Sequence, residues 1–396
     1  MGMQLASTSD IDLPNLTMTA GPGDIGAGTL AALGRQILYH YDPAFLRLYT
    51  ETTEKMKKVL FTKGDVVLMH GEALLGLEAA AYNSIEPGDK CLNLVSGYYG
   101  KGYEGFISAN GGVVAEVAVD YDDAIDPELV LGVLKKNPDI KVLSVVHSET
   151  PSSTANPVRE ICGIAKERGL ITIVDSVSGV GGIEMRVDDW GVDICVVGPQ
   201  KCLSAPPGLA IVSVSKDAWR AIEKKNPPRG TYLSLLDWKK LWLEGGVFPC
   251  TPSVSLVYAL SAALDRILEE GMESSWFRHA ECARICRAGL KGMGLELWAR
   301  SEKVAADSST AFKIPDGVKQ KEFRAYLRKR YGIMISAGLA DMADKILRIG
   351  HMGVNAKPIW VLTTLIAVGK ALRDFGVRLD VGAGIETALR EVSDAA

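Results

Sequence analysis

Short apolar runs alternate with segments of helical periodicity between about residues 65 and 215. Runs such as DVVLM, KVLSVV and LITIV are largely apolar instead of alternating with polar residues. This pattern is typical of parallel strands that are buried on both faces. The intervening segments, such as GEALLGLEAAAYNSI and REICGIAKERG, predict connecting helices. The sequence therefore predicts an α/β fold in which ligands bind beyond the carboxyl ends of the strands.

The pattern changes after about residue 250. The stretch SLVYALSAALDRILEEGMESSWFRHAECARICRAGLKGMG has apolar residues at helical spacing throughout, and it predicts a long helix that bridges two domains. Shorter units follow, including STAFKIP, KILRIGHMG and a helix from about Pro358, which predict a smaller α+β domain. We therefore divide the chain into an N-terminal arm (1–18), a large sheet domain (19–275) and a small C-terminal α+β domain (276–396).

Charge and cysteine content exclude several classes of protein. The chain has 396 residues and a net charge of -4, so we expect no nucleic-acid partner. The first residues, MGMQLASTSDIDLP, lack the apolar core of a secretory signal, and PIWVLTTLIAVGKAL is interrupted by Lys370 before it could span a membrane. The seven cysteines form no CxxC pair, which predicts reduced thiols in the cytoplasm and no metal site.

Two charged residues follow neighbouring predicted strands. Asp175 ends the run ITIVD, and Lys201 follows ICVVGPQ, 26 residues later. A short connection between these strands would bring both side chains to the same edge of the sheet. One interpretation is an ion pair at a sheet edge. The other is a lysine that forms a Schiff base with pyridoxal, with an acid that keeps the pyridine nitrogen protonated.

An aromatic ring and an arginine fit the second interpretation. The segment SGYYGKGY offers Tyr98 and Tyr99 to stack on a pyridine ring, although ordinary packing is the alternative. Arg348 lies within the apolar strand pattern of ILRIGHMG, where a planar guanidinium would bind a carboxylate through two parallel hydrogen bonds. We interpret the adjacent His351 as a packing residue and not as a catalyst.

Several segments occur together in an order that resembles a known family. They are MTAGPG, HGEALLGLEAAA, SGYYGKGY, HSETPSSTANP, VDSVSG, GPQKCLSAPPGLA, FPCTPSVSLVYAL and RIGHMG. This succession resembles that of class V aminotransferases of fold type I, and the resemblance covers nearly the whole chain after about residue 17. It implies a large domain with a mostly parallel seven-stranded sheet between helices and a smaller α+β domain. It also implies a homodimer with shared active sites, or a tetramer built from such dimers.

The resemblance assigns roles to individual residues. Lys201 is the Schiff-base lysine, Asp175 is the partner of the pyridine nitrogen, and Tyr99 is the stacking aromatic residue. Arg348 binds the substrate carboxylate. The cofactor-binding residues that it implies are Glu72, Tyr99, Thr150, Asp175, Gln200, Lys201 and Thr251.

Four positions bear on whether the cofactor carries a phosphate. Glu72 lies where a helix N-terminus would otherwise bind a phosphate, and its carboxylate should repel one but accept a hydrogen bond from a hydroxymethyl group. Phe248 stands where phosphate-binding relatives often have a tyrosine, and it favours the same interpretation. Gln200 is typical of phosphate-binding glyoxylate aminotransferases. Leu339 stands where the subgroup that uses pyridoxamine has a second arginine.

We therefore expect an aminotransferase that moves the amino group of pyridoxamine to pyruvate, with pyridoxal or pyridoxamine bound as a substrate at Lys201. The alternative is an alanine– or serine–glyoxylate aminotransferase that holds pyridoxal 5'-phosphate. In both, the partners are a small amine and a 2-oxo acid. A protein that binds vitamin B6 without turnover would not need Lys201, Asp175 and Arg348 together.

Overall fold

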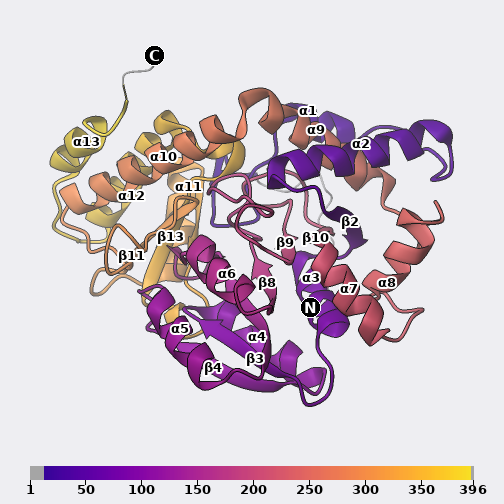
Figure 1. Cartoon of the computed structure of the whole chain (residues 1–396). Coiled ribbons are helices and arrows are strands. Elements are labelled where there is room, and N and C mark those ends of the chain that lie inside the picture. Colours follow the sequence, from indigo (N-terminus) through magenta and orange to yellow (C-terminus); the bar gives the residue numbers. More distant parts are fainter. Residues whose placement is uncertain (1–12, 394–396) are drawn as a thin grey trace, which may run out of the picture.

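The computed structural model describes residues 13–393 and contains a seven-stranded sheet at its centre (Figure 1). All its neighbouring strands are parallel except β10, which is antiparallel to both β2 and β9. The predicted α/β fold with a mostly parallel seven-stranded sheet is therefore confirmed. In spatial order the strands are β2 (Asp65–His70), β10 (Leu209–Val214), β9 (Ile194–Val197), β8 (Ile171–Asp175), β5 (Ile140–Val146), β3 (Lys90–Val95) and β4 (Val113–Ala118).

Helices cover both faces of this sheet. The chain runs from β2 through β3 to β4 in one direction along the sheet, and from β4 through β5 to β8 in the other. Because parallel crossovers are right-handed, this reversal places α3 and α4 on one face and α5 and α6 on the opposite face. The helix bounds are α3 (Ala73–Ser84), α4 (Tyr98–Ala109), α5 (Pro127–Lys136), α6 (Val158–Lys166) and α7 (Lys216–Lys225).

A second, four-stranded sheet is built mainly from the C-terminal part of the chain, on one side of the molecule in Figure 1. Its order is β1 (Leu16–Met18), β12 (Ile333–Ala337), β13 (Ile346–Gly350) and β11 (Ser309–Lys313). Strand β1 pairs parallel with β12, so part of the segment that we expected to be an arm lies in this sheet. The first twelve residues of that arm lie outside the described residues. The helices of this region are α10 (Met272–Gly292), α11 (Gln320–Tyr331), α12 (Pro358–Asp374) and α13 (Val381–Leu389).

The prediction of one long helix after residue 250 is wrong, because the structure has two helices there. Helix α9 (Val254–Glu270) ends at Gly271, and α10 begins at the next residue. Gly271 has φ 87°, a conformation that residues with a Cβ rarely adopt, and it breaks the helical backbone. Apolar periodicity continues across the break because both helices bury one face.

Two large apolar clusters form the core. One extends from Ala32 to Met272 around the large sheet, and the other joins β1 to residues 282–388 around the small sheet. The division into domains at residues 19–275 and 276–396 stays a prediction. The remaining elements are α1 (Ala27–Leu33), α2 (Pro43–Leu60), β6 (Ser148–Glu149), β7 (Thr154–Ala155), α8 (Leu235–Asp237), η2 (Trp238–Leu243), η3 (Ala340–Met342) and η4 (Gly353–Asn355). Within residues 13–393, no helix is both long enough and apolar enough to cross a membrane.

Candidate active site

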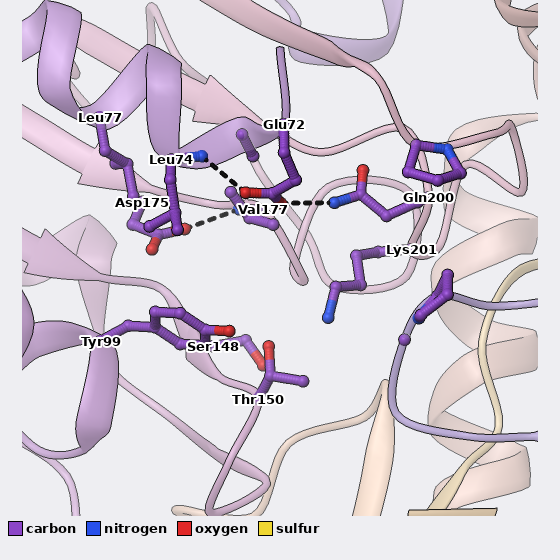
Figure 2. Close-up of a pocket in the computed structure, with 14 residues that line it drawn as sticks. Glu72, Leu74, Leu77, Tyr99, Ser148, Thr150, Asp175, Val177, Gln200 and Lys201 are labelled. Carbon is purple, nitrogen blue, oxygen red and sulfur yellow. Dashed lines mark hydrogen bonds between the residues drawn. The ribbon is translucent and has the colours of Figure 1, made fainter. Parts of the chain in front are cut away.

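A cavity of about 330 Å³ opens at the carboxyl edge of the large sheet. The segments that follow β2, β3, β5, β8 and β9 all reach it, as expected for an α/β fold. Six predicted site residues line the cavity, and Figure 2 shows them around one space. They are Glu72, Tyr99, Thr150, Asp175, Gln200 and Lys201.

Lys201 lies in the loop after β9, and its side chain is buried. Its Nζ donates a hydrogen bond of 3.0 Å to the carbonyl oxygen of Ala20. Burial, together with the positive charge of Arg348, lowers the pKa of Lys201 to about 8. A much larger fraction of this amine is therefore neutral near pH 8 than of an ordinary lysine, which is what attack on an aldehyde requires.

The lysine has this position because Gly21 has no side chain. A Cβ at Gly21 would lie 2.6 Å from Cε of Lys201, and the residue has φ 115°, which residues with a Cβ rarely adopt. Gly21 belongs to the MTAGPG segment, one of those that carry the family resemblance, but the sequence did not indicate that it contacts the lysine. It lines the cavity together with Pro22.

Asp175 is the last residue of β8, and it lies beside Val196 of the parallel strand β9. The predicted convergence of Asp175 and Lys201 at one sheet edge is confirmed, since both line the cavity. One carboxylate oxygen of Asp175 accepts a hydrogen bond of 2.9 Å from the amide of Val177. Burial raises the pKa of Asp175 to about 6, although this hydrogen bond and Lys201 act in the opposite direction. A positively charged group that entered beside Asp175 would stabilise its ionised form.

Tyr99 lies in the first turn of α4, and its side chain lines the cavity beside Ser148 and Thr150 (Figure 2). Burial, followed by the negative charge of Asp175, raises the pKa of Tyr99 to about 12, so the phenol is protonated at neutral pH. Its partner in the predicted pair, Tyr98, is partly exposed, and it meets the Tyr99 ring edge-on with 5.4 Å between centroids.

Arg348 lies on β13 and is buried, and it does not itself line the cavity. Its Nε donates to the carbonyl oxygen of Ala337 at 2.7 Å, and one terminal nitrogen donates to the carbonyl oxygen of Thr150 at 2.6 Å. Two backbone carbonyls thus fix the guanidinium, and donors remain for a carboxylate. Burial lowers the pKa of Arg348 to about 10, while the nearby Tyr99 raises it, so the group stays cationic at neutral pH.

Glu72 caps the N-terminus of α3 at one side of the cavity. Its Oε2 accepts a hydrogen bond of 3.0 Å from the amide of Leu74, and its Oε1 accepts one of 2.7 Å from the side-chain amide of Gln200 (Figure 2). The carboxylate therefore occupies the helix N-terminus, which is the position that would otherwise attract an anion. The other side-chain atom of Gln200, Oε1, is buried without a partner.

Comparison with known proteins gives a family for this arrangement. The family model for class V aminotransferases matches residues 29–352. The chain belongs to the class V aminotransferase family. It is 45% identical to pyridoxamine–pyruvate transaminase of Mesorhizobium japonicum over 95% of this chain and 96% of the relative.

Solved structures give the same fold. This class V aminotransferase superposes on pyridoxamine–pyruvate aminotransferase of Mesorhizobium loti with a TM-score of 0.93 at 44% identity, covering 96% of this chain and 97% of the other. Ureidoglycine–glyoxylate aminotransferase of Bacillus subtilis follows with a TM-score of 0.91 at 28% identity, covering 96% and 99%. The chain is therefore a fold type I aminotransferase, as its sequence motifs indicated.

Class V aminotransferases depend on pyridoxal 5'-phosphate. The cavity of this aminotransferase fits the pyridine ring of that group better than its phosphate. Lys201, Asp175 and Tyr99 suit the pyridine ring and its aldehyde, because they supply a buried amine, an acid and an aromatic face. The phosphate fits less well, since Glu72 already accepts from the first turn of α3 and would repel a dianion.

Six candidate residues lie outside the lining of the cavity: Tyr98 and Arg348, described above, and Thr251, Phe248, Leu339 and His351. Thr251 is exposed just before α9, and its predicted contact with the cofactor stays a prediction. Phe248 packs within the aminotransferase itself, stacked on Trp242 with 4.0 Å between ring centroids. Leu339 is exposed beside η3.

His351 is fully buried beside Thr310, and its Nε2 lies 2.8 Å from the Thr310 hydroxyl. Burial lowers the pKa of His351 to about 3, so the side chain is neutral. It does not line the cavity. Among the described residues there is also no group of three or more histidine, cysteine, aspartate or glutamate side chains arranged to hold a metal ion.

Sequence reasoning missed Glu149. Its carboxylate accepts hydrogen bonds from the amides of Tyr99 and Gly100, next to the cavity. The available signal was a carboxylate three residues after the apolar run KVLSVV, because a carboxylate so close to the end of a buried strand is rarely without a partner.

Proposed function

We propose that this aminotransferase transfers the amino group of pyridoxamine to pyruvate and produces pyridoxal and L-alanine. The observation that carries the proposal is the carboxylate of Glu72 at the N-terminus of α3, held by Gln200. A cofactor that stays bound needs an anion site for its phosphate, and here a negative charge occupies that site. A ring that carries a neutral hydroxymethyl group meets no such repulsion and can donate a hydrogen bond to Glu72. The named activity of the Mesorhizobium japonicum relative supports the same substrates.

Three residues act on the vitamin B6 ring in this proposal. When bound, the ring supplies an aldehyde or amine and withdraws electrons from the substrate carbon. Asp175 would accept a hydrogen bond from a protonated pyridine nitrogen, and the positive charge of that nitrogen would favour the ionised form of Asp175. Tyr99 covers the face of the ring. Lys201 would supply the amine that bonds to the aldehyde, and its Nζ would carry a proton between the substrate carbon and the exocyclic carbon of the ring.

Arg348 binds the carboxylate of the 2-oxo acid. Because the carbonyl oxygens of Ala337 and Thr150 hold the guanidinium, it is oriented before the substrate arrives. Leu339 supplies no second positive charge. Of positions 339 and 348, only Arg348 can therefore bind the carboxylate. Thr150 lines the cavity and contributes to the ring site, and its hydroxyl contacts that of Ser178.

The second candidate keeps the same residues and binds pyridoxal 5'-phosphate permanently, with alanine or serine as donor and glyoxylate as acceptor. Gln200 favours it, since this glutamine is typical of glyoxylate aminotransferases, and a glyoxylate aminotransferase is among the similar structures. Gln200 also donates to Glu72, however, and this contact supports the first proposal.

We also propose that the enzyme is a cytoplasmic homodimer that acts in vitamin B6 degradation, with assembly into a tetramer as the alternative. Exposed apolar side chains on the segments near Phe248 and its ring neighbour Tyr41 support a subunit interface. In such a dimer Thr251, three residues after Phe248 in the sequence, would reach a partner's active site. Free thiols at all seven cysteines support a reducing compartment. The exposed apolar side chains are Ile37, Tyr39, Tyr232 and Val247.

Two transamination reactions measured in parallel test the proposal: pyridoxamine with pyruvate, and alanine with glyoxylate. We expect turnover with pyridoxamine and pyruvate in protein that is colourless and free of phosphorus after dialysis. A yellow protein that retains phosphorus and turns over alanine with glyoxylate would support the second candidate instead. Protein that turns yellow with pyridoxal but not with pyridoxal 5'-phosphate would exclude the second candidate.

A further inference from the structure

Glu149 is a fully buried carboxylate beside the cavity, at the end of the short strand β6. Its Oε1 accepts a hydrogen bond of 2.7 Å from the amide of Gly100, and its Oε2 accepts one of 3.1 Å from the amide of Tyr99. Both amides belong to the first turn of α4, whose own N-cap residue, Gly97, supplies no side chain. A residue 50 positions away in the sequence therefore caps this helix.

A local cap would satisfy the same amides at lower cost. Asp126 caps α5 and Ser215 caps α7 from the position just before each helix. A carboxylate loses far more hydration free energy when it is buried than when it stays at the surface. Burial raises the pKa of Glu149 to about 7 although the amides of Gly100 and Tyr99 lower it, and the charge of Asp175 raises it further. Stability of the helix alone does not account for a buried carboxylate here.

The chain at Gly97 is adapted to this carboxylate. A Cβ at Gly97 would lie 2.6 Å from Cγ of Glu149, so a capping side chain at that position would displace Glu149. The two features depend on each other: the glycine leaves the amides uncapped, and the space beside it holds the glutamate.

The capped residue is the one whose ring lines the cavity. The amide that donates to Oε2 belongs to Tyr99, and both sequence neighbours of Glu149, Ser148 and Thr150, line the same cavity. Glu149 thus links the start of α4, which carries the Tyr99 ring, to its own neighbours Ser148 and Thr150 in the cavity lining. The backbone of Thr150 in turn accepts a hydrogen bond from Arg348.

We propose that Glu149 is a positioning residue that holds the start of α4 so that the Tyr99 ring stacks on the bound pyridine ring. This inference rests on the proposed function, because stacking requires a vitamin B6 ring in the cavity. It adds a residue that acts through Tyr99 and does not touch the ring itself.

A double-mutant cycle on the full chain tests the proposal, with the dissociation constant for pyridoxal read from the absorption change on binding. Glu149→Gln places an amide N–H₂ against a backbone N–H, and it should weaken pyridoxal binding about tenfold in the wild-type background. In the Tyr99→Ala background the same change should alter the constant less than about twofold. An equal loss in both backgrounds would overturn the proposal, because Glu149 would then act independently of the ring.

Two further proteins separate positioning from stability. Asp126→Ala removes the cap of α5, where its carboxylate accepts from the amide of Glu128, and it should lower Tm without changing the dissociation constant for pyridoxal. If Glu149→Gln does not fold, Glu149→Asp is measured in the same cycle. Aspartate keeps the charge, but its shorter side chain moves the carboxylate away from the amides of Tyr99 and Gly100. Wild-type protein that gives no absorption change with pyridoxal or with its phosphate would overturn the proposed function itself. Wild-type binding without coupling to Tyr99 would overturn only the role of Glu149.

Discussion

The side-chain amide of Gln200 donates a 2.7 Å hydrogen bond to the carboxylate of Glu72. Gln200 directly precedes Lys201, and Glu72 directly precedes α3, so this contact joins the lysine loop to the helix that would carry a phosphate. The contact fixes a negative charge at that helix N-terminus.

Glu72→Gly should therefore improve binding of pyridoxal 5'-phosphate by about tenfold or more, because a like charge is removed from the phosphate position. Binding of unphosphorylated pyridoxal should weaken. Titration with each form, followed by absorbance, gives both constants. Glu78→Gln, an exposed change on the same helix, is the matched control and should leave both constants unaltered. Unchanged affinity for the phosphate form in Glu72→Gly would contradict our account of this residue.

Replacement of Lys201 by alanine should abolish turnover, since among the described residues that line the cavity no other lysine could form the covalent link or move the proton. Lys201→Arg is the companion variant, because it keeps a positive charge but cannot provide a neutral amine at neutral pH. Steady-state rates with pyridoxamine and pyruvate measure both. A Lys201→Ala protein with a near-wild-type rate would exclude the covalent mechanism.

The pH dependence of pyridoxal binding should reflect the burial of Lys201. Only the neutral amine attacks an aldehyde, and the pKa of Lys201 is lowered to about 8. Affinity should therefore rise as the pH increases and should level off above about 8. Absorbance titrations between pH 6 and about 11 follow this rise. A midpoint near the ordinary lysine value would show that burial does not activate the amine.

Gly21→Ala should weaken pyridoxal binding, although it replaces no residue that takes part in the reaction. The new methyl group would lie 2.6 Å from Cε of Lys201 and would require a strained φ of 115°. We expect a loss of at least about tenfold in pyridoxal affinity. The matched control is Gly28→Ala in α1, where a Cβ meets nothing within 4 Å and helix propensity favours alanine. Equal behaviour of the two variants would show that Gly21 does not position the lysine.

Asp175→Asn should stabilise the protein without ligand while it removes activity. Burial raises the pKa of Asp175 from 3.8 to about 6, so the folded state binds more protons than the unfolded state between those values. The wild type therefore loses stability as the pH rises through that window, by up to about 3 kcal/mol, and the asparagine variant does not. Urea unfolding at pH 4 and pH 8 measures the difference, which should grow with pH. A difference independent of pH would contradict this account.

The sequence was sufficient to predict the elements whose signal is local. The apolar runs ending at Asp175 and before Lys201 predicted two buried parallel strands, and parallel strands place their carboxyl ends together. The family motifs then indicated Glu72 and Tyr99, which also reach the cavity.

Features that depend on distant contacts were not predictable in this way. Gly271 interrupts a continuous apolar periodicity, and only its backbone conformation shows the break. Strand β1 is three residues long and pairs with β12, more than 300 residues later, so its sequence carries little signal. Glu149 has its function only because the first turn of α4 lies beside it.

Strand β1 pairs with the small sheet at Leu16–Met18, and two residues later the carbonyl oxygen of Ala20 accepts the hydrogen bond from Lys201. The backbone at Ala20 therefore contacts the reactive amine directly. Shortening the chain by twenty residues, or fusing a partner protein in place of them, would remove the resting contact of that amine and the edge of the second sheet in a single step.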